Sequence, residues 1–270
     1  MRPGSCERAD QWLYDGGLLD AATGGLLRPG GLALTGRAVQ LCALRAGARV
    51  VDVGCGTGAT VGHLRHAFGL RAVGVEASPG VLGRRCGEAR GALVQGQGAE
   101  LPLRAGSAEG VLLECCLSAM AEPARVLAEC RRVLEPGGRL AVTDLFLREG
   151  PARPLHRGPA RAGEVDGLPA AAAGSCVAGA LTRDALLASL RRGGFAVEVW
   201  EDHSRALVEL LAGLLLAHGS LRPFWEGQCA PGGDPGALER AVRGLRPGYF
   251  LLVARKELHP RTACGESDER

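Results

Sequence analysis

Short apolar runs alternate with longer amphipathic stretches through the middle of the chain. The strand-like runs are rich in Val, Leu and Ala and lie at 49–53, 71–76, 91–95, 110–114 and 139–146. The helix-like stretches repeat apolar residues every three or four positions and lie at 59–67, 79–90 and 123–134. Apolar strands that alternate with helices across short connections are typical of right-handed βαβ units. The pattern therefore predicts an α/β fold with a doubly wound, mostly parallel sheet.

The segments on either side of this repeat are less regular. Helical patterns at 11–19 and 33–44 predict an N-terminal helical arm, residues 1–47. Four prolines within 149–175 break the pattern and predict a long loop or lid.

Regular patterns return after residue 175. A helix at 182–192 can begin at Thr182, because a threonine hydroxyl caps the first turn well. The elements expected after it are a strand at 195–201, a helix at 205–216, a loop holding Trp225 and Cys229, a helix at 235–244 and a strand at 249–255. We assign 48–256 to one domain that carries the insertion at 149–175, and 257–270 to a polar tail that we expect to be disordered.

Composition limits the partners of this domain. The 32 Lys and Arg and 29 Asp and Glu residues are interspersed, and their net charge of +3 leaves no basic footprint for nucleic acid. Aromatic residues make up only 4% of the chain, so few side chains could stack on bases. We therefore expect no nucleic-acid partner. The sequence makes no prediction of the oligomeric state.

Apolar runs and cysteines bear on the compartment. No run approaches the ~20 apolar residues of a membrane span, and the most apolar segment, 206–218, is broken by Glu209. No signal-peptide layout is found at the start. We expect a soluble, cytoplasmic protein without a membrane partner, whose ten cysteines do not form disulfides. No C-x-x-C pair occurs, so we expect no metal site.

The richest local feature is a glycine turn after the first strand. Asp52 ends that strand, and Gly54, Gly56 and Gly58 follow before a helical pattern begins. Glycines so placed let a ligand approach bare backbone N–H groups at a helix N-terminus. Read from Gly54 to Ala59, the turn satisfies the G-x-G-x-x-A pattern of dinucleotide-binding proteins. Read as D-x-G-x-G-x-G, it resembles motif I of the class I S-adenosylmethionine-dependent methyltransferases.

Chemistry favours the second interpretation. A dinucleotide brings a pyrophosphate, which a carboxylate such as Asp52 would repel. S-adenosylmethionine brings an ammonium, a sulfonium and a carboxylate but no phosphate. Glu76 lies about twenty residues farther on, at the end of the second strand, where a carboxylate can accept hydrogen bonds from ribose hydroxyls.

Two further motifs extend the resemblance to the class I (type 11-like) methyltransferases. Residues 96–102, Gly-Gln-Gly-Ala-Glu-Leu-Pro, resemble their G-D-A-x-x-L-P segment, with Gln97 where Asp is usual. Residues 134–140 resemble their L-x-P-G-G turn. The resemblance implies a seven-stranded Rossmann-like sheet with the last strand antiparallel, and S-adenosylmethionine as the cofactor. The cofactor-binding residues it implies are Asp52, Gly54, Cys55, Gly56, Gly58, Glu76, Ala77, Gln97, Gly98 and Glu114.

The cysteines suggest an alternative acceptor. Residues 175–181, Ser-Cys-Val-Ala-Gly-Ala-Leu, resemble the region of arsenite methyltransferases in which a cysteine holds trivalent arsenic, and 114–118 resembles their N-C-V-x-N. This interpretation makes Cys176 a candidate thiolate, with Cys229 the only plausible downstream partner. We expect Cys55 to be a small filler in the turn, and Cys42, Cys86 and Cys130 to pack on helical faces.

Three hypotheses follow for the function. The leading one is a methyltransferase that acts on a small-molecule acceptor, the second a methyltransferase of arsenite or another thiophilic element, and the third a non-catalytic S-adenosylmethionine-binding module. No residue is singled out as the catalytic base. The candidates are Glu114, Asp144, Cys115, Cys116 and Cys176, with His156 and His203 as further titratable groups. Trp12 and Tyr14 either cover the sulfonium by cation–π contact or pack the arm on the sheet.

Overall fold

The computed structural model describes residues 26, 28–84, 89, 91–148, 176–229 and 232–258. Several expectations fall outside these residues. They are the helix at 11–19 with Trp12 and Tyr14, Cys86, the segment 149–175 with His156, and most of the tail.

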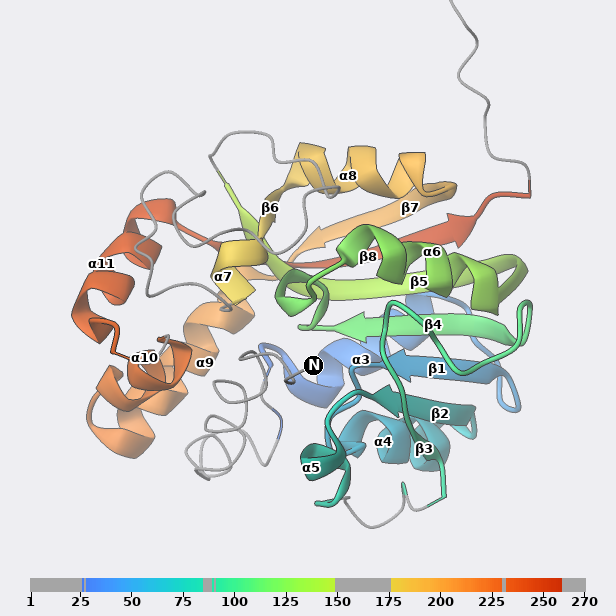
Figure 1. The fold of residues 1–270 in the computed structure, drawn as a ribbon, viewed down its shortest axis with the longest axis horizontal. Coiled ribbons are helices and arrows are strands. Elements are labelled where there is room, and N and C mark those ends of the chain that lie inside the picture. The colour runs from blue at the N-terminus through green and yellow to red at the C-terminus, as the bar shows by residue number, and fades with distance from the viewer. Residues whose placement is uncertain are drawn as a thin grey trace, which may run out of the picture.

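A single mixed sheet organises the chain (Figure 1). Its strands are β1 (Arg49–Val53), β2 (Arg71–Glu76), β3 (Leu93–Gln95), β4 (Ala108–Glu114), β5 (Leu134–Leu147), β6 (Leu181–Thr182), β7 (Phe195–Asp202) and β8 (Gly248–Lys256). The order β3-β2-β1-β4-β5-β8-β7 is parallel except for β8, which runs antiparallel to β5 and β7. The predicted doubly wound sheet with an antiparallel last strand is confirmed. The two-residue strand β6, which pairs with β5, is an addition to it.

Helices cover both faces of this sheet. They are α3 (Gly31–Leu41), α4 (Ala59–Phe68), α5 (Pro79–Leu82), the 3-10 turn η2 (Leu117–Ala119), α6 (Pro123–Val133), α7 (Cys176–Gly179), α8 (Arg183–Arg192), α9 (Ser204–His218), α10 (Arg222–Gln228) and α11 (Pro235–Leu245). The hydroxyl of Thr182 accepts a hydrogen bond from the Ala185 N–H at 3.3 Å, which confirms the predicted cap of α8.

Alternating side chains of the central strands divide the core into two layers. Val111 and Leu113 of β4 pack with residues of α6 and α8, whereas Leu112 between them packs with residues of α3 and α4. The same alternation separates Val51 from Val50 in β1. Both faces of these strands are buried, as their unbroken apolar sequence predicts.

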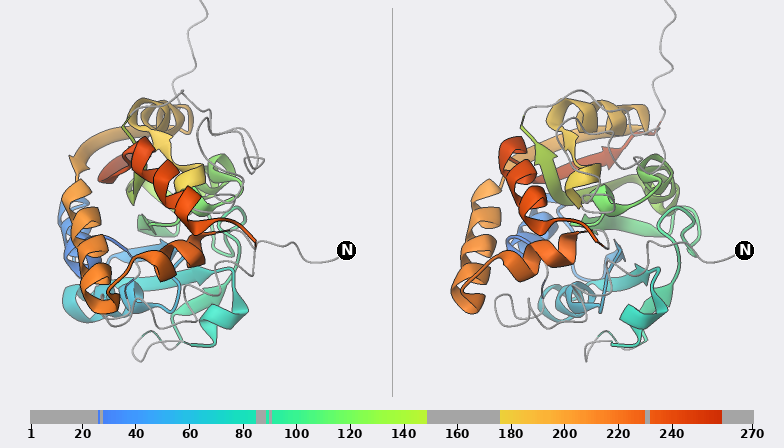
Figure 2. Two further views of the ribbon diagram at one scale, coloured as in Figure 1. Left: turned by 90° about the vertical axis from the view of Figure 1, so that its left-hand side faces the viewer. Right: turned by 60° about the vertical axis from the view of Figure 1, so that its left-hand side comes forward.

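The carboxyl ends of the parallel strands meet at one edge, where the candidate site lies. Figure 2 brings this side forward and shows α9, α10 and α11 gathered there. Val177 of α7, Trp225 of α10, and Leu238 and Val242 of α11 form a separate small apolar core. A helical cap thus stands beside the edge at which strands β1, β2 and β4 end.

Two local expectations are wrong. Trp225 lies on the helix α10 rather than in a loop, and Cys229 follows the helix as its C-cap. Pro223 fits the first turn of α10, and Arg222 pairs with Glu226 one turn later at 2.9 Å.

The L-x-P-G-G segment does not precede β5 as a separate turn but lies within the strand. Ala108 pairs with Leu134 and Gly110 with Arg139, so the segment bulges out of the sheet, and Gly137 supplies a φ of 78°.

One helix pair has some features of a membrane element. Among the described residues, no single helix is long and apolar enough to cross a membrane. Together, α9 and α10 are long and apolar enough for a broken span, but this rests on length and composition only, and the two helices are bent by 118° at their break.

The layered core leads to a stability prediction. Leu112 is fully buried at the centre of the sheet, whereas Leu216 on α9 is 86% exposed. We expect Leu112→Ala to lower the free energy of unfolding by about 2–5 kcal/mol, and Leu216→Ala by less than about 0.5 kcal/mol. Urea denaturation followed by circular dichroism measures both. Equal effects of the two substitutions would contradict the described packing.

Candidate functional site

The glycine turn joins β1 to α4 through left-handed backbone. Gly54 and Gly58 adopt φ values of 74° and 89°, which L side chains rarely reach. A Cβ atom on Gly58 would also lie 2.8 Å from the Cβ of Ala89. The N–H of Gly54 donates to the Val75 carbonyl at 2.8 Å, which ties the turn to β2. Both the conformation and the space at this turn require glycine.

Cys55 fills the interior of the same turn. Its side chain is buried, and a Cβ on Gly74 of β2 would lie 2.5 Å from its sulfur. Burial raises the pKa of this thiol, with Asp52 and Glu76 adding to the effect. Cys55 is therefore a protonated packing residue in this structure.

Glu76 at the end of β2 connects two backbone segments. One carboxylate oxygen accepts the N–H of Gly56 at 3.1 Å, and the other accepts the N–H of Ser78 at 2.9 Å. These bonds leave further lone pairs on both oxygens. The carboxylate is therefore fixed beside the glycine turn and retains acceptor capacity for a ligand.

The segment after β3 reaches the same edge of the sheet. Gln95 pairs with Glu76, and Gln97 lies two residues beyond and bridges to Glu100. A Cβ on Gly98 would lie 3.3 Å from the Cγ1 of Val53, at the end of β1. The fold therefore brings the segment of Gln97 and Gly98 beside the ends of β1 and β2.

Glu114 at the end of β4 is held by three donors. Thr35 of α3 donates to its Oε1 at 2.8 Å, and Thr60 of α4 donates to its Oε2 at 3.0 Å. The guanidinium of Arg28 lies 2.8 Å from the same Oε2 and also donates to the Thr35 hydroxyl. These bonds tie α3 and α4 to the sheet and occupy most of the acceptor capacity of Glu114.

Asp52 lies buried beside this cluster. It is 2% exposed, and its pKa is raised to about 8. Burial is the largest cause; the carboxylates of Glu114 and Glu76 add to it, and Arg28 opposes them. The charged groups that shift the pKa of Asp52 are therefore Glu76 and Glu114, which were predicted from separate motifs, and the cation Arg28.

Two of the candidate thiols meet at the rim of this site. Cys115 follows Glu114 with a φ of 55°, and its thiol hydrogen-bonds to the thiol of Cys176 at the start of α7. This bond, with burial, raises the pKa of Cys115 well above its usual value. The Tyr249 hydroxyl also interacts with Cys115 and donates to Thr143 at 3.2 Å.

The other cysteines that the structure describes do not join this pair. Cys116 turns towards β1 and donates to the Val53 carbonyl at 3.2 Å, whereas Cys229 packs in the apolar core of the cap. Cys42 and Cys130 are buried in the two core layers. Within the described ranges, no three His, Cys, Asp or Glu side chains are grouped as a metal ion would require.

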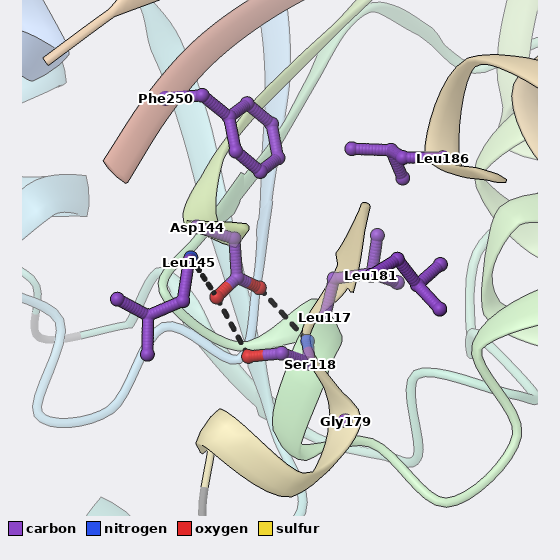
Figure 3. A pocket seen from close by; sticks show the side chains of 8 residues that line it. All are labelled: Leu117, Ser118, Asp144, Leu145, Gly179, Leu181, Leu186 and Phe250. Carbon is purple, nitrogen blue, oxygen red and sulfur yellow. Dashed lines mark hydrogen bonds between the residues drawn. The ribbon is translucent and has the colours of Figure 1, made fainter. Parts of the chain in front are cut away.

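Asp144 lines a pocket together with Ser118, Leu145 and other residues (Figure 3). Its carboxylate accepts the Ser118 hydroxyl at 2.6 Å, the Ser118 N–H at 2.8 Å and the Leu145 N–H at 2.7 Å. The other lining residues are Leu117, Gly179, Leu181, Leu186 and Phe250. Burial raises the pKa of Asp144 despite these bonds. In this structure Asp144 positions η2, on which Ser118 lies.

α7 packs tightly over η2. A Cβ on Gly179 would lie 1.8 Å from the Ser118 carbonyl oxygen, so only glycine fits at this contact. His203, the remaining described titratable candidate, lies apart at the start of α9, where its Nε2 is 2.9 Å from Glu201.

Thr60 is a site residue that sequence reasoning missed. The sequence feature that could have identified Thr60 is its position two residues after Gly58, in the first turn of α4.

Comparisons with known proteins agree with this geometry. Residues 51–142 match a family model described as a methyltransferase domain. The chain is 31% identical over 179 residues to 27-O-demethylrifamycin SV methyltransferase of Amycolatopsis mediterranei (strain S699). This alignment covers 64% of this chain and 62% of that protein. The chain therefore spans less than two thirds of the length of this curated relative.

Solved structures share the fold. The cyclase SpnF aligns with a TM-score of 0.70 at 22% identity, over 95% of this chain and 98% of that chain. Phosphoethanolamine N-methyltransferase 2 of Haemonchus contortus, in complex with S-adenosyl-L-methionine, aligns with a TM-score of 0.65 at 16% identity, over 92% of this chain and 58% of that chain. At such identities the likeness is one of fold.

The buried acid predicts a pH dependence of stability. The pKa of Asp52 is about 8 in the folded protein, against about 3.9 for an unfolded aspartate, so the folded state binds the extra proton between these values. Its contribution to stability is complete below pH 4 and is lost as the pH rises to 8. We expect the wild type to lose at least about 1 kcal/mol relative to Asp52→Asn across this range. Denaturation at pH 5 and pH 8 tests this, and parallel curves for the two proteins would contradict it.

Proposed function

We propose that this chain, which carries a class I S-adenosylmethionine-dependent methyltransferase domain, binds S-adenosylmethionine and methylates a small organic molecule. The observation that carries the proposal is the glycine turn at 54–58, with Glu76 bonded to the Gly56 N–H at the edge where β1, β2 and β4 end. The methyltransferase domain match at 51–142 includes this turn.

Each part of the site fits one part of the ligand. Glu76 can accept the ribose hydroxyls, and Gln97 and Gly98 lie where an adenine ring would follow. Glu114 and Asp52 place carboxyl groups where the ammonium and sulfonium would lie, and a bound cation would favour the ionised form of Asp52. When bound, S-adenosylmethionine supplies a methyl group activated by the sulfonium.

The residues of this chain then align the acceptor and exclude water. α7, η2 and the apolar core of α10 and α11 stand beside the carboxyl edge and supply apolar walls for an organic acceptor. Asp144 and Glu114 each already accept three hydrogen bonds, so we assign both a positioning role rather than that of a free base. A relative that acts on a rifamycin derivative supports a small-molecule acceptor.

Cofactor binding is tested by calorimetry with S-adenosylmethionine and S-adenosylhomocysteine. We expect Glu76→Ala to weaken both by about 10- to 100-fold, because bonds to a charged acceptor are lost. Glu198→Ala is the matched control, because Glu198 lies on the edge strand β7 and forms ion pairs with Arg139 and Arg255. This variant should bind both ligands as the wild type does. No binding by the wild type would refute the proposed function. Binding without turnover of any acceptor would favour the non-catalytic module.

A second candidate function rests on the contact between the Cys115 and Cys176 thiols. Two adjacent thiols suit a thiophilic acceptor such as arsenite, which would displace their protons on binding. The described residues bring no third cysteine to the pair, and this reduces support for the alternative.

The test of this alternative is turnover. Arsenite should increase the formation of S-adenosylhomocysteine, and Cys176→Ser should abolish the increase, because one sulfur ligand is removed. Cys42→Ala, at a buried cysteine that ends α3, is the control. An increase that survives Cys176→Ser would exclude the thiol pair as the acceptor site.

A further inference from the structure

The helix α9 is apolar on more than one side. It has fifteen residues, of which ten are Ala, Val or Leu and only Arg205 and Glu209 are acidic or strongly basic. Leu214 is the one buried residue of this helix, and Leu207 packs against the core layer that α3 and α4 share. A helix that is apolar around its whole circumference is normally enclosed by protein or by lipid. The described part of the chain covers only one side of α9.

Four apolar residues on another side of α9 form what we call the outer stripe. Val208 is 64% exposed, Leu215 47% and Leu216 86%. Ala212 between them is also exposed. Positions four, seven and eight residues after Val208 return to the same side of a helix, so these four side chains are neighbours. Figure 2 shows α9 at the outer side of the molecule, where the stripe is open to a partner.

The charges beside the outer stripe cancel. Arg205 lies 2.8 Å from Glu209 one turn along the helix, and α9 carries no other Lys, Arg, Asp or Glu. A helix that binds an anionic membrane surface has an excess of Lys and Arg on its polar side, which α9 lacks. The stripe therefore fits a partner surface that is apolar and has no net charge.

A second copy of α9 is such a surface, and an antiparallel pair is complementary along its length. With a two-fold axis at Ala212, Val208 of each copy lies opposite Leu216 of the other, because both are four residues from the axis. The small side chain of Ala212 lets the two helices approach at the axis. Arg205 of each copy lies opposite the C-cap Gly219 of the other, where the last carbonyl groups of a helix carry partial negative charge.

The size of the outer stripe indicates the strength of this contact. Fifteen residues form a helix about 22 Å long, and a helix with its side chains is about 10 Å wide. A contact of these dimensions is smaller than the ~800 Å² per partner of a stable interface. We therefore expect a reversible complex with a dissociation constant of roughly 10–100 µM, rather than a permanent one.

We propose that the outer stripe of α9 binds the same stripe of a second copy of this chain and forms a reversible, antiparallel dimer. This pairing covers apolar side chains that the monomer exposes to water. The contact lies in the helical cap, because α10 begins at Arg222, four residues after α9 ends. The inference does not depend on the proposed function.

The experiment is sedimentation velocity at protein concentrations from about 1 to 500 µM. The wild type should change from mostly monomer to mostly dimer over this range. Leu216→Arg should raise the dissociation constant at least about tenfold, because an unpaired charge would be buried against Val208 of the other copy. Leu258→Arg is the matched control, since Leu258 is 65% exposed but lies outside α9, and it should dimerise as the wild type does. Equal midpoints of urea denaturation show that the variants are folded.

A mixture of two variants tests the antiparallel register. Val208→Glu and Leu216→Arg should each fail to dimerise alone, because the new charge faces an apolar side chain of the other copy. In an equal mixture, the glutamate of one variant faces the arginine of the other, and the unchanged Val208 and Leu216 meet at the second contact. The mixture should therefore form dimers at concentrations at which neither variant does.

Three results would overturn the proposal. A wild type that stays monomeric at every concentration excludes the dimer, and binding of that monomer to phosphatidylcholine vesicles would assign the stripe to a membrane. Dimerisation of Leu216→Arg at wild-type strength shows that another surface makes the contact. A mixture that does not dimerise, although the wild type does, contradicts the antiparallel arrangement.

Discussion

The convergence of three carboxylates at one edge of the sheet is the constraint on which the site depends. Glu76 and Glu114 are the last residues of β2 and β4, and Asp52 lies one residue before the end of β1. Parallel pairing of these strands brings their ends together. Burial disfavours the charged form of Asp52, and the nearby carboxylates of Glu114 and Glu76 add to this effect, so the pKa of Asp52 rises to about 8. In the folded chain, the raised pKa favours the protonated form of Asp52, and Arg28 pairs with Glu114.

The same constraint explains the attachment of the N-terminal segment. α3 contributes Thr35 and the residues before it contribute Arg28, and both reach the Glu114 carboxylate on the central strand β4. Thr60 brings α4 to the same carboxylate. Glu114 is thus the point at which two helices of one layer and the sheet are joined by polar bonds, above an otherwise apolar core. A change in the charge of Glu114 would therefore weaken the hydrogen bonds that attach both α3 and α4 to β4.

The sheet and the glycine turn could be predicted because their signals are local. A five-residue strand followed at once by Gly54, Gly56 and Gly58 carries its own conformation, and each strand and helix shows its period within a few residues. The partners of Glu114 could not be predicted in this way. Arg28 and Thr35 lie far from it in the chain, and only the packing of α3 on the sheet places them there. Trp225 was missed as a helical residue because proline and glycine around it are typical of loops, although Pro223 begins a helix.

The thiol pair shows how the cofactor edge and the cap are coupled. Cys115 directly follows Glu114, and Cys176 begins α7, which packs on η2 through Gly179 and on α10 and α11 through Val177. Any acceptor that reaches the edge beside Glu114 therefore meets residues whose positions depend on the cap. Because the left-handed backbone at Cys115 fixes one thiol to the sheet, a shift of α7 would move the other thiol away from it. Under the proposed function, the position of α7 would therefore affect which acceptors fit at this edge, whereas the cofactor would contact the ends of the strands.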